Sequence, residues 1–217
     1  MKQKPLGMRI GESLFCIFYL CFAAYAAFTF SSKGNTLSSL CAIMALLLGG
    51  GDGFHLIPRV IIDLKGETAD EEENRKRTFY LGLGNIVSSI TMTLFYVYFY
   101  RVMELRTRTK VPSILFIILV MLTFIRIGLC LFPQNDWFKG SNLKWGIIRN
   151  IPFVIIGLIV VYILVAYHKS YLLAALVTVS FVCYMLVVLY ARKKPAIGMM
   201  MIPKTICYIW IIAILLG

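Results

Sequence analysis

Residues 49–59 read GGGDGFHLIPR and fall inside the second long apolar segment of the chain. They place a carboxylate (Asp52), an imidazole (His55) and a guanidinium (Arg59) where a membrane-spanning helix is otherwise expected. An ionisable side chain in hydrocarbon costs about 2.5–3.5 kcal/mol even on a lenient insertion scale, so residues of this kind usually serve a function. Helical spacings of three and four residues put the three groups on roughly one face. We therefore interpret this stretch as the centre of a site, with Asp52 and His55 as candidate catalytic residues.

The glycines of this stretch allow two local structures. Gly49 to Gly51 and Gly53 carry no side chains, which permits either a closely packed neighbouring helix or an unwound segment beside a cavity. Pro58 loosens a helix here, because it cannot donate to the carbonyl of Phe54 and its ring crowds that carbonyl. Both structures remain open at this point.

The composition of the chain is that of a membrane protein. Of its 217 residues, 60% are hydrophobic and only 15% are charged, and the mean hydropathy is +0.83. A soluble domain is about 45–50% apolar and about 25% charged. The net charge of +12 is typical of loops that face anionic lipid head groups, and no basic patch with interleaved aromatic residues indicates nucleic acid as a partner.

Seven apolar segments are long enough to cross about 30 Å of hydrocarbon at about 1.5 Å per residue. They lie near residues 11–31, 36–62, 78–101, 111–132, 145–167, 170–191 and 199–216. We predict an all-α protein, a polytopic bundle of about seven transmembrane helices that forms a single domain over residues 1–217. The sequence leaves its oligomeric state open.

The basic residues of the loops predict an orientation in the cell membrane. Twelve fall on one side: Lys2, Lys4, Arg9, Lys65, Arg75, Lys76, Arg77, Lys139, Lys144, Arg192, Lys193 and Lys194. Six fall on the other: Lys33, Arg101, Arg106, Arg108, Lys110 and Lys169. Because cytoplasmic loops carry the excess of Lys and Arg, we expect the N-terminus inside and the C-terminus outside.

Two short connections carry further polar groups. Residues 68–71 (TADE) fit a capping box, and Glu72 and Glu73 stand four residues before Lys76 and Arg77, so the third helix is expected to begin outside the membrane. His168 lies in the hairpin between the fifth and sixth spans, where we expect it to be solvated.

The third span carries a stripe of small and polar residues at spacings of three and four: Gly82, Asn85, Ser89 and Thr93, with Ser88 adjacent. Small residues usually allow helices to pack closely in a membrane. The same stripe would also form a polar wall opposite Asp52. The sequence favours neither interpretation.

Three further basic residues lie within the spans. Arg126 or Arg149 would pair with Asp52 as a structural ion pair, or hold a lipid phosphate, and Arg59 and Arg149 would reach the head groups by snorkelling. Lys204, in the seventh span, suggests a retinal protein as a further possibility, but its place near the helix end is explained by snorkelling. Two histidines and one deep aspartate do not supply the three or four ligands of a zinc site, so we expect no metal and no cofactor.

The pattern resembles the YhhN-like family of integral membrane proteins, whose characterised members are lysoplasmalogenases. The residues that carry the likeness are Gly51-Asp52 with Leu56 and Pro58, then Phe79, Tyr80, Gly82 and Gly84, then Phe95, Tyr96, Tyr98 and Phe99, and last Cys207-Tyr208. The family's second carboxylate, after a serine in the penultimate helix, has no counterpart, because Ser180 is followed by Phe181.

The resemblance implies a lipid-active hydrolase with a membrane lysolipid as its substrate. Asp52 would protonate a vinyl ether as general acid, and His55 would position or deprotonate water. The substrate-binding candidates are Arg59, Asn85, Ser89, Arg126, Arg149 and Tyr208. The alternative is a transporter or ligand-binding membrane protein without catalysis, with the glycine-rich stretch as its binding site.

Overall fold

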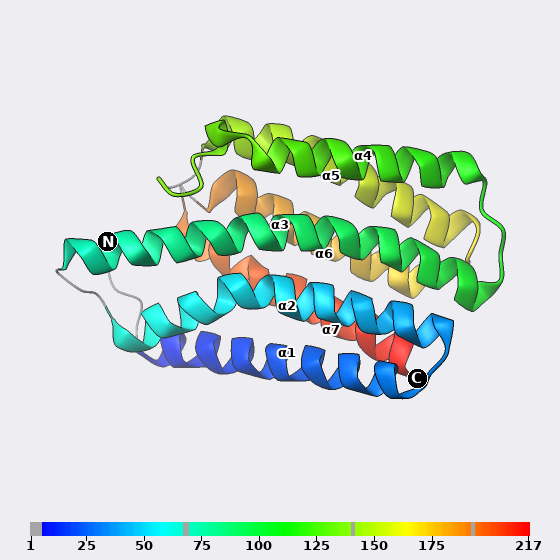
Figure 1. Cartoon of the computed structure of the whole chain (residues 1–217), viewed down its shortest axis with the longest axis horizontal. Helices are drawn as coiled ribbons and strands as arrows, with labels where there is room; N and C mark the ends of the chain where they lie inside the picture. Colours follow the sequence, from blue (N-terminus) through cyan, green and yellow to red (C-terminus); the bar gives the residue numbers. More distant parts are fainter. Residues whose placement is uncertain (1–5, 67–69, 140–141, 192–193) are drawn as a thin grey trace.

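The protein is a bundle of seven α-helices that run roughly along one long axis (Figure 1). The computed structural model describes residues 6–66, 70–139, 142–191 and 194–217. The helices are α1 (Leu6–Ser32), α2 (Thr36–Lys65), α3 (Glu71–Thr107), α4 (Ser113–Leu131), α5 (Leu143–Ala166), α6 (Tyr171–Tyr190) and α7 (Met201–Leu216). Two short 3₁₀ segments, η1 (Pro133–Asn135) and η2 (Pro195–Met200), precede α5 and α7. Within the described ranges there is no β-strand.

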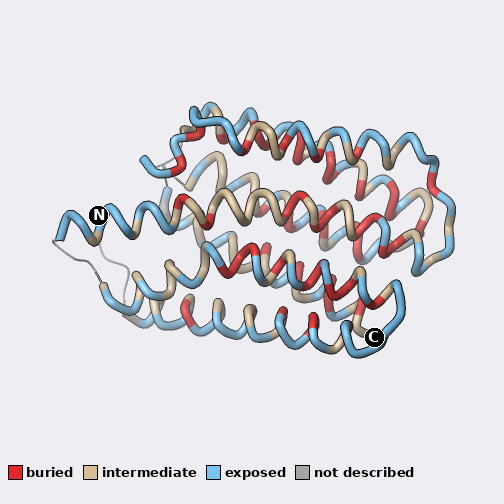
Figure 2. The backbone as a smooth tube through the Cα atoms, viewed as in Figure 1, coloured by how far each residue is buried: buried red, intermediate tan, exposed pale blue. Residues whose placement is uncertain are grey.

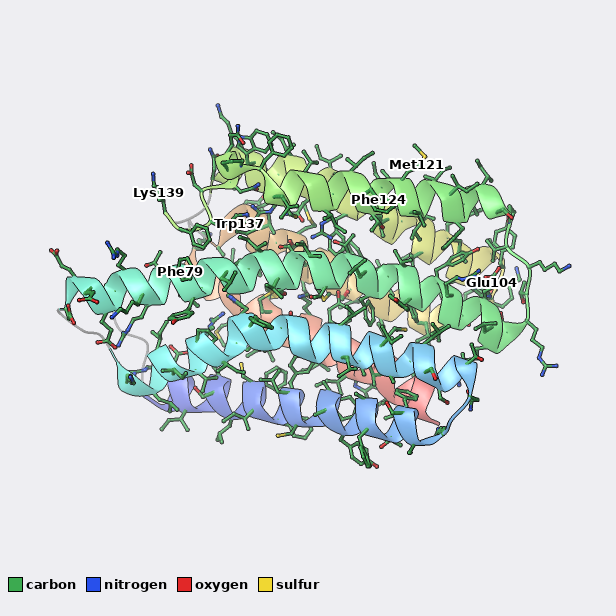
Figure 3. All side chains as sticks on the ribbon, in the orientation of Figure 1. Phe79, Glu104, Met121, Phe124, Trp137 and Lys139 are labelled. Carbon is green, nitrogen blue, oxygen red and sulfur yellow. The ribbon has the colours of Figure 1, made fainter. Side chains whose placement is uncertain are left out.

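All seven helices are long and apolar enough to cross a membrane, so the chain is a multi-pass membrane protein. The predicted fold class is confirmed. Large apolar side chains cover the outside of the bundle: Met121 and Phe124 of α4 are 58% and 71% exposed and point away from the other helices (Figure 3). Since seven spans are an odd number, α1 begins and α7 ends at opposite ends of the bundle (Figure 1).

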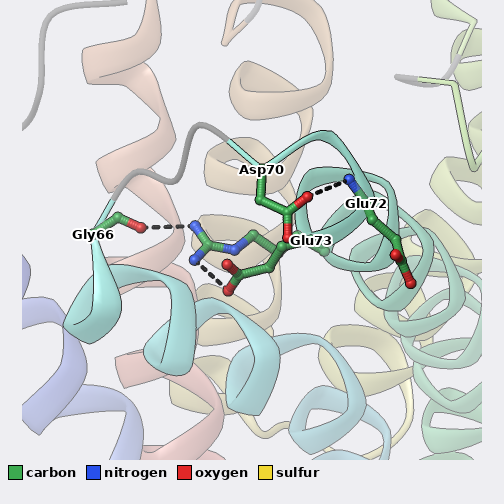
Figure 4. Close-up of polar contacts among 5 residues, drawn as sticks. Gly66, Asp70, Glu72 and Glu73 are labelled. Carbon is green, nitrogen blue, oxygen red and sulfur yellow. Dashed lines mark hydrogen bonds and ion pairs between the residues drawn. The ribbon is translucent and has the colours of Figure 1, made fainter.

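The junction between α2 and α3 is fixed by polar contacts (Figure 4). Asp70 caps α3 by accepting a hydrogen bond from the backbone N–H of Glu72 at 3.0 Å. Arg77 donates to the carbonyl of Gly66 at 2.7 Å and pairs with Glu73 at 2.8 Å. These contacts start α3 well before the apolar part of the helix, as the sequence predicts.

Two of the predictions for the loops fall partly outside the described residues. Thr68, the first residue of the expected capping box, lies outside them, as do Lys2, Lys4, Arg192 and Lys193 of the charge count. The expected pair between Glu72 and Lys76 is present at 2.6 Å.

The glycines of α2 and α3 bring these two helices together. A Cβ atom on Gly84 of α3 would lie 2.6 Å from the Cα of His55, and one on Gly49 would lie 2.6 Å from the Cβ of Ala23 in α1. Helix α2 continues through Asp52 and Pro58, although it bends in its second half (Figure 1). Of the two structures that the glycines allow, the close neighbour is therefore the one that forms.

The apolar core occupies the half of the bundle that holds the C-terminus (Figure 2). The buried residues of α2 end at Gly53 and those of α3 begin at Gly82. At the other end, where α2 finishes and α5 and α7 begin, the helices enclose a polar cavity instead.

The close approach of α2 and α3 predicts opposite effects at two helical glycines. Gly84→Ala is expected to lower the free energy of unfolding by about 1–3 kcal/mol, because the new methyl group meets the backbone of α2. Gly50→Ala is the matched control: its Cβ meets nothing within 4 Å, so it should leave stability unchanged or raise it by up to about 1 kcal/mol. Thermal unfolding of both variants in detergent tests this, and equal effects would show that the helices are not tightly packed at Gly84.

The hairpin between α5 and α6 differs from the prediction of a solvated His168. The side chain is only 8% exposed, and its Nδ1 lies 2.7 Å from the hydroxyl of Thr107. Burial lowers the pKa of His168, while the charge of Glu104 acts more weakly in the opposite direction.

This burial predicts a loss of stability in acid. Because the pKa of His168 is lower in the folded state, the unfolded chain takes up the proton first, and stability falls as the pH drops below about 6.5. The fall in melting temperature between pH 7.5 and pH 5.5 should be smaller in His168→Gln than in the unsubstituted protein. An identical fall in both would show that His168 does not resist protonation.

Candidate functional site

A cavity of about 270 Å³ lies among α2 to α7 at the end of the bundle away from the core. Its polar and charged lining residues are Asp52, His55, Arg59, Asn85, Ser88, Ser89, Arg126, Asn142, Arg149, Lys204 and Thr205. Seven of the eight candidates named from the sequence therefore lie around one space. Tyr208 is the exception, and it does not line the cavity.

Asp52 is held in the cavity wall by hydroxyl groups. Its side chain accepts hydrogen bonds from the hydroxyl of Tyr19 in α1 at 2.9 Å and from that of Ser88 in α3 at 2.6 Å. In the part of the chain that the structure describes, no basic nitrogen lies within ion-pair distance of this carboxyl group. The structural ion pair with Arg126 or Arg149 is therefore not formed, and Asp52 faces the cavity.

His55 lies one turn further along α2 and lines the same cavity. Gly84 lets α3 approach this turn closely, which fixes the backbone that carries the imidazole. Among the described atoms, its Nδ1 has no hydrogen-bond partner. The imidazole therefore lines the cavity while this nitrogen is buried and makes no hydrogen bond within the described residues.

The stripe on α3 serves both purposes that the sequence left open. Asn85, Ser88 and Ser89 line the cavity as a polar wall. The hydroxyl of Ser89 also donates to the carbonyl of Asn85 at 2.7 Å, within its own helix. Gly82, at the start of the stripe, packs closely, because a Cβ there would lie 2.6 Å from the carbonyl oxygen of Trp137.

Arg126 is a buried cation without a carboxylate partner. It is 1% exposed, and its Nη2 donates to the amide oxygen of Asn150 at 3.4 Å. The guanidinium lies 3.2 Å from the centroid of the Phe153 ring. Within the described residues, its Nε and Nη1 have no hydrogen-bond partner. An amide and a ring orient this charge, but neither neutralises it.

Arg149, on the neighbouring wall, also contacts an amide and an aromatic ring. Its Nη1 donates to the amide oxygen of Asn135 at 2.8 Å, and the guanidinium lies 3.8 Å from the ring centroid of Trp137. Trp137 belongs to the loop after α4, and its side chain lies between this loop and α3 (Figure 3). Arg149 is therefore buried in the cavity wall and does not snorkel.

The other two cations enter from α2 and α7. Arg59 is 35% exposed and lies 3.5 Å from Glu12 of α1, so one side chain both pairs with an acid and borders the cavity. Lys204 is 6% exposed, and its Nζ lies 5.5 Å from the ring of Tyr184 and 5.3 Å from that of Tyr208. Burial of Lys204 contradicts the expectation that it snorkels.

Tyr208 belongs to the core beneath the cavity. It is 1% exposed, and its hydroxyl lies 2.9 Å from that of Tyr96 and 3.4 Å from that of Ser180. It contributes a ring face near Lys204 and does not reach the space where a substrate would lie.

The charges of the cavity are unbalanced. Of the 22 Lys and Arg residues, 18 belong to the twelve and six basic residues counted above on the two sides of the membrane. The remaining four all line this cavity: Arg59, Arg126, Arg149 and Lys204. Among the lining residues that the structure describes, Asp52 is the single acid. Within those same residues, no three His, Cys, Asp or Glu side chains gather as metal ligands do. The cavity is therefore suited to an anion.

Sequence reasoning missed several residues of the site. The sequence indicated Ser88 only as a neighbour of the stripe, and it indicated Lys204 as a snorkelling residue or the lysine of a retinal protein, not as part of this cavity. Tyr19, Trp137 and Tyr184 gave no signal, because an aromatic residue in an apolar segment is usually part of the core. Their roles depend on contacts between helices far apart in the sequence.

An uncompensated buried charge predicts that Arg126 reduces stability. Arg126→Met should raise the free energy of unfolding by about 1.5–2.5 kcal/mol, because removal of the charge gains about 2.5–3.5 kcal/mol and the lost hydrogen bond costs about 1 kcal/mol. Arg106→Met is the matched control, since Arg106 is exposed and donates to the carbonyl of Ile214 at the far end. Thermal unfolding without ligand measures both, and a clear loss of stability in Arg126→Met would make this arginine a structural support.

Comparison of the chain with protein families, curated proteins and solved structures gives no match.

Proposed function

We propose that the protein binds a lysolipid in the cavity and hydrolyses its vinyl-ether bond, as the YhhN-like resemblance implies. One observation carries this proposal: Asp52 lies inside the bundle, faces the cavity and is held by two hydroxyl groups instead of a basic partner. An acid in such a place is available for chemistry with a guest molecule.

The chemistry needs one proton and one water molecule. Asp52 gives its proton to the outer carbon of the C=C bond, which leaves an oxocarbenium ion at the carbon next to oxygen. Water adds to that carbon, and its proton passes to the imidazole of His55, which lines the cavity. The resulting hemiacetal breaks its C–O bond: the departing glycerol oxygen takes a proton from His55 and the hemiacetal hydroxyl gives its proton to Asp52. A fatty aldehyde and the alcohol of the glycerol backbone leave, and both side chains return to their starting protonation states. Tyr19 and Ser88 donate to the carboxyl group throughout and keep it in position.

The basic residues supply the binding of the phosphate. Arg59, Arg126 and Arg149 line the cavity beside Asp52, and guanidinium groups bind phosphate through paired hydrogen bonds. Asn85 and Ser89 add polar contacts from α3. Tyr208 has no contact with substrate in this proposal.

The proposed orientation in the cell membrane follows the basic loops. The cavity lies at the end of the bundle where α1 begins, which is the side with twelve Lys and Arg residues against six. The excess of basic residues supports a cytoplasmic location for this end.

The hydrolase proposal predicts that Asp52→Asn abolishes turnover. Asn has nearly the same shape but no acidic proton, so hydrolysis of a lysoplasmalogen should fall at least 100-fold, a loss expected for a general acid. Asp136→Asn is the matched control, because Asp136 lies outside the cavity in a left-handed turn that Asn tolerates. Release of the fatty aldehyde by the purified protein is the measurement. Unchanged release in Asp52→Asn would rule out this role.

A binding or transport protein without catalysis is the second candidate. This function is favoured because the cavity has a single carboxyl group among its described lining residues. The resemblance implies a second carboxyl group in the penultimate helix, where this chain has Phe181 after Ser180. Ligand binding without aldehyde release in the unsubstituted protein, together with uptake into proteoliposomes that depends on Asp52, would identify this function.

A further inference from the structure

We infer that the head group bound in the cavity is an anionic phosphate without an amine, such as a phosphomonoester or a glycerol phosphodiester. This inference rests on the proposed function for the presence of a lysolipid. It separates two classes of lysolipid: those with a net negative head group, and those whose choline or ethanolamine cancels the phosphate charge.

The charges that line the cavity favour a net anion. Among the described lining residues, Arg59, Arg126, Arg149 and Lys204 stand against Asp52, and Glu12 pairs with Arg59. Helix α5 also begins at the cavity, since Leu143 is its first residue and lines it, whereas α7 continues from η2, whose carbonyls already accept from the N–H of Met201. The N–H groups of a helix N-terminus carry partial positive charge and bind phosphate.

Arg126 provides an independent indication of an anionic ligand. Its Nε and Nη1 are buried without a partner among the described residues, while the side chain is 1% exposed. Leaving such donors unpaired costs about 1–3 kcal/mol, and more when they are charged. Phosphate oxygens bind guanidinium groups in pairs and would satisfy both donors.

The aromatic residues of the cavity are not available to an ammonium group. Proteins bind choline on the faces of aromatic rings. Among the described lining residues the aromatic side chains are Trp137, Phe153 and Tyr184, and each already lies under a cation of the chain, at 3.8 Å, 3.2 Å and 5.5 Å respectively. A second cation would meet the repulsion of the first.

The size of the cavity prevents an amine from lying elsewhere. Pockets that hold a whole drug-sized ligand are about 300–1,000 Å³, and this one, at about 270 Å³, holds little more than a head group. An ammonium group attached to the phosphate would therefore stay among the four basic side chains. Among the described lining residues, Asp52 is the one acid that this ammonium group would meet, against four basic side chains.

A matched pair of lysolipids tests the inference directly. Lysophosphatidylglycerol and lysophosphatidylethanolamine share the acyl chain and the phosphodiester, but only the second has an ammonium group. Binding of each to the full-length protein in a non-ionic detergent, at about 0.15 M salt, should favour lysophosphatidylglycerol by at least tenfold. Equal binding, or a preference for lysophosphatidylethanolamine, would overturn the inference.

Variants assign the preference to the cavity. Lys204→Gln and Arg126→Gln should each reduce the tenfold ratio to about threefold or less, whereas Lys110→Gln, an exposed residue outside the cavity, should leave it unchanged. If Lys110→Gln lowers the ratio as much as the cavity variants do, the preference arises from the general charge of the protein, and the inference is overturned. The ratio in the unsubstituted protein remains decisive if a cavity variant does not fold.

Two further measurements separate the possible outcomes. Glycerol 3-phosphate that competes as well as lysophosphatidylglycerol would assign the cavity to a soluble phosphate and overturn the lipid head group. Aldehyde release from the vinyl-ether forms of both lipids is measured in parallel. Preferential binding without release supports this inference and removes the hydrolase, whereas equal release from both lipids supports the hydrolase and removes this inference.

Discussion

The buried guanidinium of Arg126, which has no carboxylate partner within the described residues, is the constraint around which one half of this bundle is built. Arg126 and Arg149 are oriented by the amide oxygens of Asn150 and Asn135 and by the rings of Phe153 and Trp137. A carboxylate partner would stabilise such a cation but would also cancel it. An amide fixes the direction of the guanidinium and leaves its charge for a ligand. The stability that this arrangement costs is recovered in the other half, where an apolar core packs.

The carboxyl group of Asp52 is likewise held by uncharged groups. Asp52 receives hydroxyl donors from two helices, Tyr19 of α1 and Ser88 of α3, while α2 carries it. The close packing at Gly84 and Gly49 keeps these three helices in position, so the geometry around Asp52 depends on residues that have no side chains. A site supported by helix packing is more rigid than one that a loop supports.

The sequence predicted the fold class and the seven spans, because length and hydropathy are enough to recognise a helix that must satisfy its own backbone in lipid. It also predicted seven residues of the cavity, since charges in apolar segments are costly and therefore conspicuous. It did not predict which structure the glycines adopt, because that depends on the neighbours of α2. Tyr208 was selected by resemblance alone and lies in the core, while Tyr19 and Trp137 became visible only when the helices were placed together.

The length of α3 has a consequence for how a lipid would reach the cavity. Its 37 residues extend about 55 Å at about 1.5 Å per residue, well beyond about 30 Å of hydrocarbon. Part of α3 therefore extends beyond the hydrocarbon, and the cavity is lined from Asn85 onward on this helix and by Trp137 of the loop after α4. For the lysolipid of the proposed function, entry from the side of the bundle would leave the acyl chain in the bilayer.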